Sequence, residues 1–371
     1  MRKFFLEIDW LTILPVLAIT IMGLIILISL NINGVTVVSQ GLIIKHIISI
    51  LLGLIIAIII SKVDYRSFST LIQPLFFSIS GLLLLVLIFG VRLNGAKSWF
   101  SIGPLNLQPG EFAKIVLVLI VAHYFSRYHH RLNNFFLILL SLLPVLLIVT
   151  LILLQPDFGT AIILIFIWLG MFIFGGIKFK HILVLFTLGL AGFATLWLWV
   201  FRDYQKQRII TLFDPTSDPL GSGYNTLQSM RAISSGGMMG IKEQIILVPE
   251  VHTDFIFSGF AQQWGFVGVS IYFLIILIII ARVMYIGFKA QDSFPKMIIL
   301  GVILSILIQL VINIGMNIGI LPITGVPLPF MSYGGSAMLV YWILIGLVLS
   351  VQKHKLSQGT IFMKDNQDIF G

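Results

Sequence analysis

Residues 249–268 read PEVHTDFIFSGFAQQWGFVG. Glu250, His252 and Asp254 stand here directly before an apolar stretch that is long enough to cross a bilayer. The same residues close the long polar segment from Arg202 to Asp254, which carries 11 of the 37 charged side chains of the chain. Polar chemistry therefore meets the membrane boundary at this point, and we expect any active site to lie here.

The composition of the chain is that of an integral membrane protein. Of 371 residues, 58% are hydrophobic and 10% are charged, and the mean hydropathy is +1.09, far outside the range of soluble globular domains. The lack of cysteine excludes disulfides and thiolate metal sites. The net charge of +9 is spread over short loops, which indicates membrane topology rather than a nucleic-acid partner.

Ten apolar runs are long enough to span hydrocarbon. The sequence therefore predicts an all-α polytopic membrane protein, with a single integral domain over 1–371, a large extracytoplasmic loop at 202–254 and a short cytoplasmic tail at 353–371. The predicted spans are 11–31, 42–61, 69–91, 109–126, 135–154, 158–176, 181–201, 255–281, 297–320 and 329–351.

The distribution of lysine and arginine predicts the orientation. With both termini in the cytoplasm, 14 basic residues fall in cytoplasmic segments and seven in external loops, and five of those seven lie in 202–254. The positive-inside rule is weak for long segments of this kind. In this orientation eight of the 14 acidic residues lie at the outer face, so binding or catalysis is expected there.

Asp254 is the strongest candidate for a catalytic residue. Its place before an apolar helix is equally typical of an N-cap, since aspartate is common at that position. A carboxylate at the membrane boundary is partly desolvated, however, which makes it a better proton acceptor near neutral pH. Glu250 and His252 precede it in the same turn and join it as candidate substrate contacts.

Three more ionisable residues lie at predicted membrane depth. Glu111 and Lys114 are three residues apart on a predicted helix and can pair on one face. Such a pair either locks helices together or contacts the substrate. Asp157 follows Pro156 after a short turn and is predicted to cap the next helix, which alone accounts for its presence.

Two loops are predicted to contribute to the same outer site. Arg208 and Arg231 of the long segment can hold a pyrophosphate by charge-assisted hydrogen bonds, although contact with anionic lipid headgroups explains them as well. Residues 321–338 read LPITGVPLPFMSYGGSAM, and irregular backbone at membrane depth is tolerated where it lines a cavity. Ser332 of this loop and Lys97 complete the candidate substrate contacts.

Five segments together resemble the SEDS family of bacterial cell-wall glycosyltransferases, and the match spans nearly the whole chain. They are NGAKSWFSIGPLNLQPGEFAK, QPDFGT, the stretch from YQKQRI to NTLQS, PEVHTDFIF and LPITGVPLPFMSYGGS. The stretch DPTSDPLGSGY and the short tails look more like the rod-elongation members than the division members. The resemblance implies that Asp254 is the family's essential aspartate, and it also matches Glu111, Lys114, Asp157 and Arg208 to polar residues of the family's motifs.

The chain departs from the family pattern in three places. Gly110 stands where the family usually has serine, Gln262 and Gln263 stand where it usually has two acids, and the loop before Pro249 is shorter. The last two departures lie beside the expected site, so they bear on the role of Glu250 and on the local loop geometry.

The resemblance implies a peptidoglycan glycosyltransferase that polymerises lipid II on the outer face of the bacterial cytoplasmic membrane during elongation. We expect Asp254 to be the general base, and we expect Arg208, together with Lys97 or Arg231 and a divalent cation such as Mg²⁺, to stabilise the departing undecaprenyl pyrophosphate. The implied partners are a class B penicillin-binding protein and the elongation machinery. Two alternatives stay open, namely a lipid II flippase and a non-catalytic scaffold for a transpeptidase.

Overall fold

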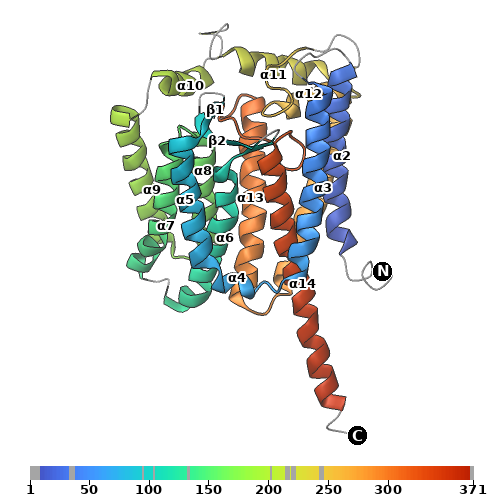
Figure 1. The fold of residues 1–371 in the computed structure, drawn as a ribbon. Helices are drawn as coiled ribbons and strands as arrows, with labels where there is room; N and C mark the ends of the chain where they lie inside the picture. Colours follow the sequence, from blue (N-terminus) through green and yellow to red (C-terminus); the bar gives the residue numbers. More distant parts are fainter. Residues whose placement is uncertain are drawn as a thin grey trace.

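The computed structural model describes residues 9–32, 38–93, 96–102, 105–131, 134–200, 203–213, 218, 223–241 and 246–367. Within these ranges the protein is a bundle of long helices that stand side by side (Figure 1). Nine of the described helical segments are long and apolar enough to cross a membrane, with Phe179–Trp199 counted as one segment of 21 residues, and α8, Phe158–Phe174, is a shorter apolar helix of 17 residues. The predicted polytopic α-helical fold with about ten spans is thereby confirmed.

All but the last of the nine longer helices begin within four residues of a predicted start, because each apolar run satisfies its own backbone polar groups only as a helix. They are α2 (Trp10–Ile32), α3 (Gln40–Lys62), α5 (Ile72–Phe89), α6 (Pro109–Tyr128), α7 (Phe135–Leu153), α9 (Phe179–Thr195), α12 (Ile256–Phe288), α13 (Ser293–Asn317) and α14 (Gly335–Gln367). Short turns of helix flank three of them, namely α4 (Ser67–Thr70), η1 (His129–Arg131) and the π-helical η2 (Leu196–Val200).

The start of the last predicted span was wrong, whereas its end at 351 lies close to the end of the apolar part of the helix at His354. Helix α14 begins at Gly335 rather than at 329, because the proline-rich residues before it form an irregular loop. At its other end the helix continues to Gln367, past the predicted start of a tail at 353, and it projects from the bundle (Figure 1).

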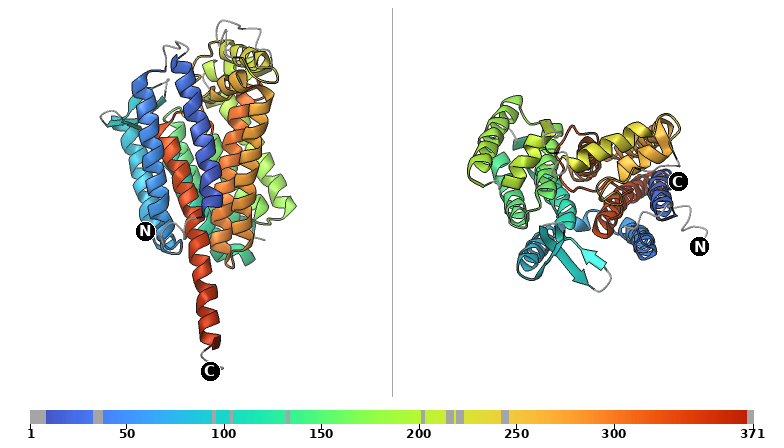
Figure 2. Two further views of the ribbon diagram at one scale, coloured as in Figure 1. Left: turned by 90° about the vertical axis from the view of Figure 1, so that its right-hand side faces the viewer. Right: turned by 90° about the horizontal axis from the view of Figure 1, so that it is seen from above.

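The connections also carry structure that the apolar pattern did not predict. A small antiparallel sheet of order β1-β2-β3 follows α5 and lies at the edge of the bundle (Figure 2). The long polar segment contains α10 (Asp203–Phe213) and α11 (Tyr224–Ser235). The strands are β1 (Val91–Leu93), β2 (Ala96–Ile102) and β3 (Leu105–Leu107).

Helices α10 and α11 lie across one end of the bundle, here called the α11 end (Figure 1). The start of α2 and the end of α14 lie at the opposite end. Large apolar side chains on the periphery are well exposed, as Phe77 at 70% and Leu277 at 62% illustrate. In contrast, 72% of the spanning part of α13 is buried. The spanning parts of α14 and α6 are buried to a similar degree, at 78% and 67%, so these three helices form the centre of the bundle and the other spans face lipid.

Candidate active site

The turn from Glu250 to Phe255 is a tightly hydrogen-bonded structure at the α11 end. Glu250 adopts a φ of 53°, and its carbonyl accepts hydrogen bonds of 3.1 Å from the backbone N–H groups of Thr253 and Phe255. The Thr253 hydroxyl donates to Glu250 Oε2 at 3.0 Å. Helix α12 then begins at Ile256 with Phe255 as its N-cap. The interpretation of Asp254 as the capping residue is therefore wrong, because the turn extends one residue beyond it.

Asp254 is half-buried, and its backbone is held by the end of α13. The side-chain amides of Asn313 and Asn317 donate to the Asp254 carbonyl at 2.8 and 3.1 Å. On the other side lies Gly325, where an added Cβ would stand 3.5 Å from Asp254 Oδ2. The carboxylate is thus placed between the turn that carries it and the proline-rich loop before α14.

This proline-rich loop, 318–334, is tied directly to the turn. The Tyr333 N–H donates to the His252 carbonyl at 2.9 Å, and the Ser332 hydroxyl donates to the Thr253 carbonyl at 2.6 Å. Ser332 Oγ also accepts from the Leu328 N–H at 2.7 Å. The predicted cavity-lining loop is therefore beside Asp254, and the Ser332 hydroxyl joins the two segments.

His252 lies buried between this loop and Glu250. Its ring centroid is 6.0 Å from that of Tyr333, and its Nε2 is 3.9 Å from Glu250 Oε2. Burial lowers the pKa of His252 below its ordinary value, and the nearby Glu250 carboxylate opposes that shift in pKa. The imidazole is consequently neutral near neutral pH and presents a donor and an acceptor rather than a positive charge.

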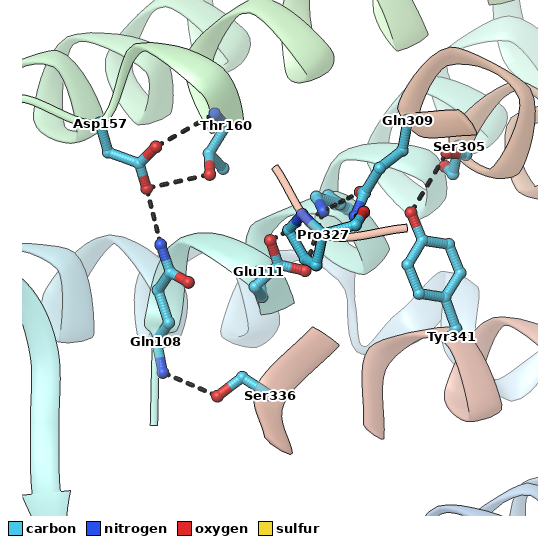
Figure 3. Close-up of polar contacts among 10 residues, drawn as sticks. Gln108, Glu111, Asp157, Thr160, Ser305, Gln309, Pro327, Ser336 and Tyr341 are labelled. Carbon is cyan, nitrogen blue, oxygen red and sulfur yellow. Dashed lines mark hydrogen bonds and ion pairs between the residues drawn. The ribbon is translucent and has the colours of Figure 1, made fainter. Parts of the chain in front are cut away.

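Glu111 and Lys114 form the predicted ion pair on α6, and both side chains are buried. Lys114 Nζ donates to both Glu111 oxygens, at 2.9 and 2.8 Å, and also to Gln309 Oε1. The ammonium lies 5.7 Å from the centre of the Tyr341 ring. Figure 3 shows Glu111 of this pair beside Pro327, with Gln309 next to them. The pair therefore connects α6 to α13 and α14, and it lies inside the protein rather than facing lipid.

Asp157 caps α8, as predicted, and also reaches α6. Its carboxylate accepts from Thr160 N at 3.1 Å and from Thr160 Oγ1 at 2.9 Å. Gln108 Nε2 donates to Asp157 Oδ2 at 2.7 Å, while the Gln108 N–H donates to Ser336 Oγ at 2.9 Å (Figure 3). This network joins the beginnings of three helices at the α11 end, so Asp157 has a structural function there.

The predicted basic contacts are distributed over three elements. Arg231 is exposed on α11. Lys97 lies on β2 and donates to the Ile88 carbonyl at 2.9 Å, which satisfies the last turn of α5. Arg208 lies in α10, but its side chain is outside the described residues. Among these three residues, Arg231 is therefore the one that is described as exposed to solvent at the α11 end.

Gln262 and Gln263 lie next to a break in α12. The helix leaves helical geometry at Gly265, where φ is 62° and ψ is −165°. The Gln262 carbonyl accepts from Ile241 N at 2.9 Å, and its side-chain amide donates to Ser235 Oγ at 3.3 Å. The Gln262 side chain thus binds the last residue of α11, and its backbone carbonyl holds Ile241 of the segment after α11.

Three site residues were missed in the sequence, namely Gln309, Asn313 and Asn317 of α13. All three are fully buried and point into the site or the ion pair. Their signal was a polar residue every fourth position in an otherwise apolar span, which places them on one face.

In the described part of the chain, no group of three His, Asp or Glu side chains could hold a metal ion, so a divalent cation stays a prediction.

Comparison with known proteins places the chain in one family. The peptidoglycan glycosyltransferase MrdB of Escherichia coli is 34% identical over 347 residues, which cover 92% of this chain and 94% of MrdB. A solved structure described as a peptidoglycan synthase complex that coordinates polymerization and crosslinking superposes with a TM-score of 0.80, at 32% identity, over 94% of this chain and 98% of its own.

The crystal structure of the rod shape determining protein RodA of Thermus thermophilus superposes with a TM-score of 0.69, at 28% identity, over 94% of this chain and 97% of its own. The family profile described as "Cell cycle protein" and named for FtsW, RodA and SpoVE matches residues 9–357. The chain therefore belongs to the FtsW/RodA/SpoVE family.

Proposed function

We propose that this protein is a peptidoglycan glycosyltransferase that polymerises lipid II into glycan strands for cell-wall elongation and the maintenance of cell shape. The relatives support the reaction class, because MrdB carries that name over nearly the full length of both chains. The structural similarity to a rod shape determining RodA supports elongation. The reaction class and the role in elongation are properties of those proteins. We assign them to this chain because of the geometry of its candidate site.

The observation that carries the proposal is the position of Asp254. It combines a half-buried carboxylate, a backbone held by two asparagines and a neighbouring loop that approaches its Oδ2. A group fixed in this way can accept a proton in one defined direction, as general-base catalysis requires.

In the proposed reaction Asp254 takes the proton from the 4-hydroxyl of the incoming lipid II. The hydroxyl oxygen attacks the anomeric carbon of the growing strand, and the bond from that carbon to the pyrophosphate of the polyprenyl carrier breaks. The leaving pyrophosphate gains negative charge, which Arg231 and Arg208, with Lys97, are proposed to stabilise. A single displacement inverts the anomeric centre.

The proposed location is the bacterial cytoplasmic membrane, with both termini in the cytoplasm and the site at the outer face. The excess of basic residues in the segments at the end opposite α11 supports this orientation. The start of α2 and the end of α14 lie at that same end (Figure 1). A site at the outer face has no access to nucleotide-sugars, which fits a donor that is already linked to lipid.

The proposed partner is a class B penicillin-binding protein of the elongation machinery. The support is the similarity to a peptidoglycan synthase complex. A divalent cation such as Mg²⁺ is also proposed, which would neutralise charge on the leaving pyrophosphate when bound, because Mg²⁺ bound to phosphates needs few protein carboxylates. Its test is the loss of polymer on chelation with EDTA and its recovery on addition of Mg²⁺.

The test of the proposed function is reconstitution with a candidate transpeptidase partner and labelled lipid II. Polymer from the wild type is expected, with a loss of about a hundred- to ten-thousand-fold in rate for Asp254→Asn. Asp203→Asn is the matched control, because Asp203 is an exposed acid of α10 at the same end. Near-normal polymer synthesis by Asp254→Asn would overturn the assignment of Asp254 as the general base. No polymer from any variant, with lipid II crossing vesicles instead, favours the flippase.

A further inference from the structure

Helix α13 carries a ladder of buried polar side chains that meets both parts of the site. Ser305, Gln309, Asn313 and Asn317 recur every four residues and are all 0% exposed. This spacing places them above one another on a single face of the helix. Buried amides persist inside a membrane protein only where their donors and acceptors are satisfied, so each rung of the ladder has a definite partner.

The Asn313 rung joins two separate chain segments. Its amide has two N–H donors, of which one is given to the Asp254 carbonyl at 2.8 Å and the other to the Val326 carbonyl at 2.7 Å. Asp254 and Val326 belong to the turn before α12 and to the loop before α14. One –NH₂ group thereby sets the distance between the two segments that flank the carboxylate.

The Gln309 rung continues this connection one turn along the helix. Its Nε2 donates to the Pro327 carbonyl at 2.8 Å, and its Oε1 accepts from Lys114 Nζ. The two successive carbonyls of Val326 and Pro327 are therefore held by two successive rungs. Gly325 is the residue before them, and an added Cβ there would stand 3.5 Å from Asp254 Oδ2. A continuous path of hydrogen bonds and adjoining residues therefore runs from the buried ion pair to the backbone of Asp254.

We propose that Asn313 and Gln309 are positioning residues for Asp254. They hold segment 325–327 against the Asp254 turn, and the Glu111–Lys114 pair acts on the site through Gln309 and this segment rather than by touching substrate. The inference rests on the proposed role of Asp254. Its consequence is kinetic, because a displacement of about 1 Å at a reacting group costs about a hundredfold in rate while binding of the substrate persists.

The test is a graded series at Asn313. Asparagine supplies two donors, Asn313→Asp at most one, and Asn313→Leu none, at similar side-chain size. The matched control is Ser305→Ala, because Ser305 lies on the same ladder but its hydroxyl donates within α13, to the Gly301 carbonyl at 2.7 Å, rather than to the Asp254 turn. We expect kcat for polymerisation to fall in the order Asn, Asp, Leu, by about ten- to a hundredfold for leucine, with KM for lipid II changed by less than about threefold.

A second measurement separates positioning from activity. The chain has no cysteine, so Asp254→Cys introduces a single thiol whose rate of reaction with a methanethiosulfonate reagent reports the position of that side chain. Adding Asn313→Leu or Gln309→Leu is expected to change this rate several-fold, and adding Ser305→Ala is not. All rates are compared below the Tm of each variant.

The outcomes distinguish the two levels of the proposal. A normal kcat in a folded Asn313→Leu variant overturns the inference, as does a fall in kcat without a change in the labelling rate. If the wild type makes no polymer, the proposed function fails, while the labelling experiment still decides whether the ladder positions residue 254. If Asp254→Cys is then labelled at the same rate with and without Asn313→Leu or Gln309→Leu, the ladder does not position residue 254.

Discussion

Gln108 Nε2 donates a hydrogen bond of 2.7 Å to Asp157 Oδ2, although the two residues are 49 positions apart in the sequence. The bond joins the beginning of α6 to the beginning of α8 at the α11 end. Because α6 also carries Glu111 and Lys114, the position of the buried ion pair depends on a carboxylate that lies outside it. Several consequences of this arrangement can be measured.

Asp157→Ala removes the acceptor of three hydrogen bonds, two from Thr160 and one from Gln108. The helix cap is lost and the Gln108 side-chain amide loses its acceptor. Together these changes are expected to lower the free energy of unfolding by about 2–4 kcal/mol. Asp157→Asn keeps a carbonyl oxygen for the cap and is expected to lose less. SDS titration in mixed micelles measures both, and equal losses for alanine and asparagine contradict the capping role.

Lys114→Met leaves the Glu111 carboxylate buried without its cation, which is expected to cost about 3–5 kcal/mol of unfolding free energy. The double variant Glu111→Gln with Lys114→Met removes both charges and is expected to be more stable than Lys114→Met alone. Asp64→Asn is the control, since its pair with Arg66 is 3.8 Å long and exposed at the surface, and such pairs contribute about 0–1 kcal/mol. Additive losses in the double variant are inconsistent with a coupled pair.

Gly265→Ala introduces a Cβ where none fits. The residue has a φ of 62°, and an added Cβ would stand 2.4 Å from the Gly240 nitrogen. The break at Gly265 also lets Phe266 N donate to the Gly237 carbonyl at 2.9 Å. We expect a loss of about 3 kcal/mol or more in unfolding stability.

The control for this change is Gly81→Ala in α5, because nothing lies within 4 Å of the added Cβ there. Its effect on unfolding stability is expected to stay within about 1 kcal/mol. Similar effects at the two glycines in thermal unfolding would falsify the argument from backbone geometry.

His252 is expected to make the folded state sensitive to acid. Its folded pKa lies below the ordinary value of 6.5 because the ring is buried, so the unfolded state binds more protons as the pH falls through 6.5. Stability is then highest above that pH and decreases below it. The Tm of the wild type is expected to fall more than that of His252→Gln between about pH 7.5 and pH 5.5. Parallel curves for the two proteins count against this prediction.

The parts of this protein that the sequence determined are those set by local chemistry. Apolar runs of spanning length must be helices, because hydrocarbon offers no partner to a free peptide group, and the ten spans follow from that alone. The Asp157 cap and the Glu111–Lys114 pair were also predictable, because their partners lie three residues away. The start of α14 was misplaced because apolar loop residues 329–334 look like a span when only their hydropathy is considered.

The parts that only the tertiary structure decided join residues far apart in the chain. Gln309 meets Lys114 across 195 positions, Asn313 meets Asp254 across 59 and Ser332 meets Thr253 across 79. Hydropathy marks these polar residues as anomalies in an apolar context but does not assign their partners. The partner of a buried amide is the group that packing brings within hydrogen-bond distance, so the support of Asp254 became visible only once α13, the turn and the proline-rich loop were packed together.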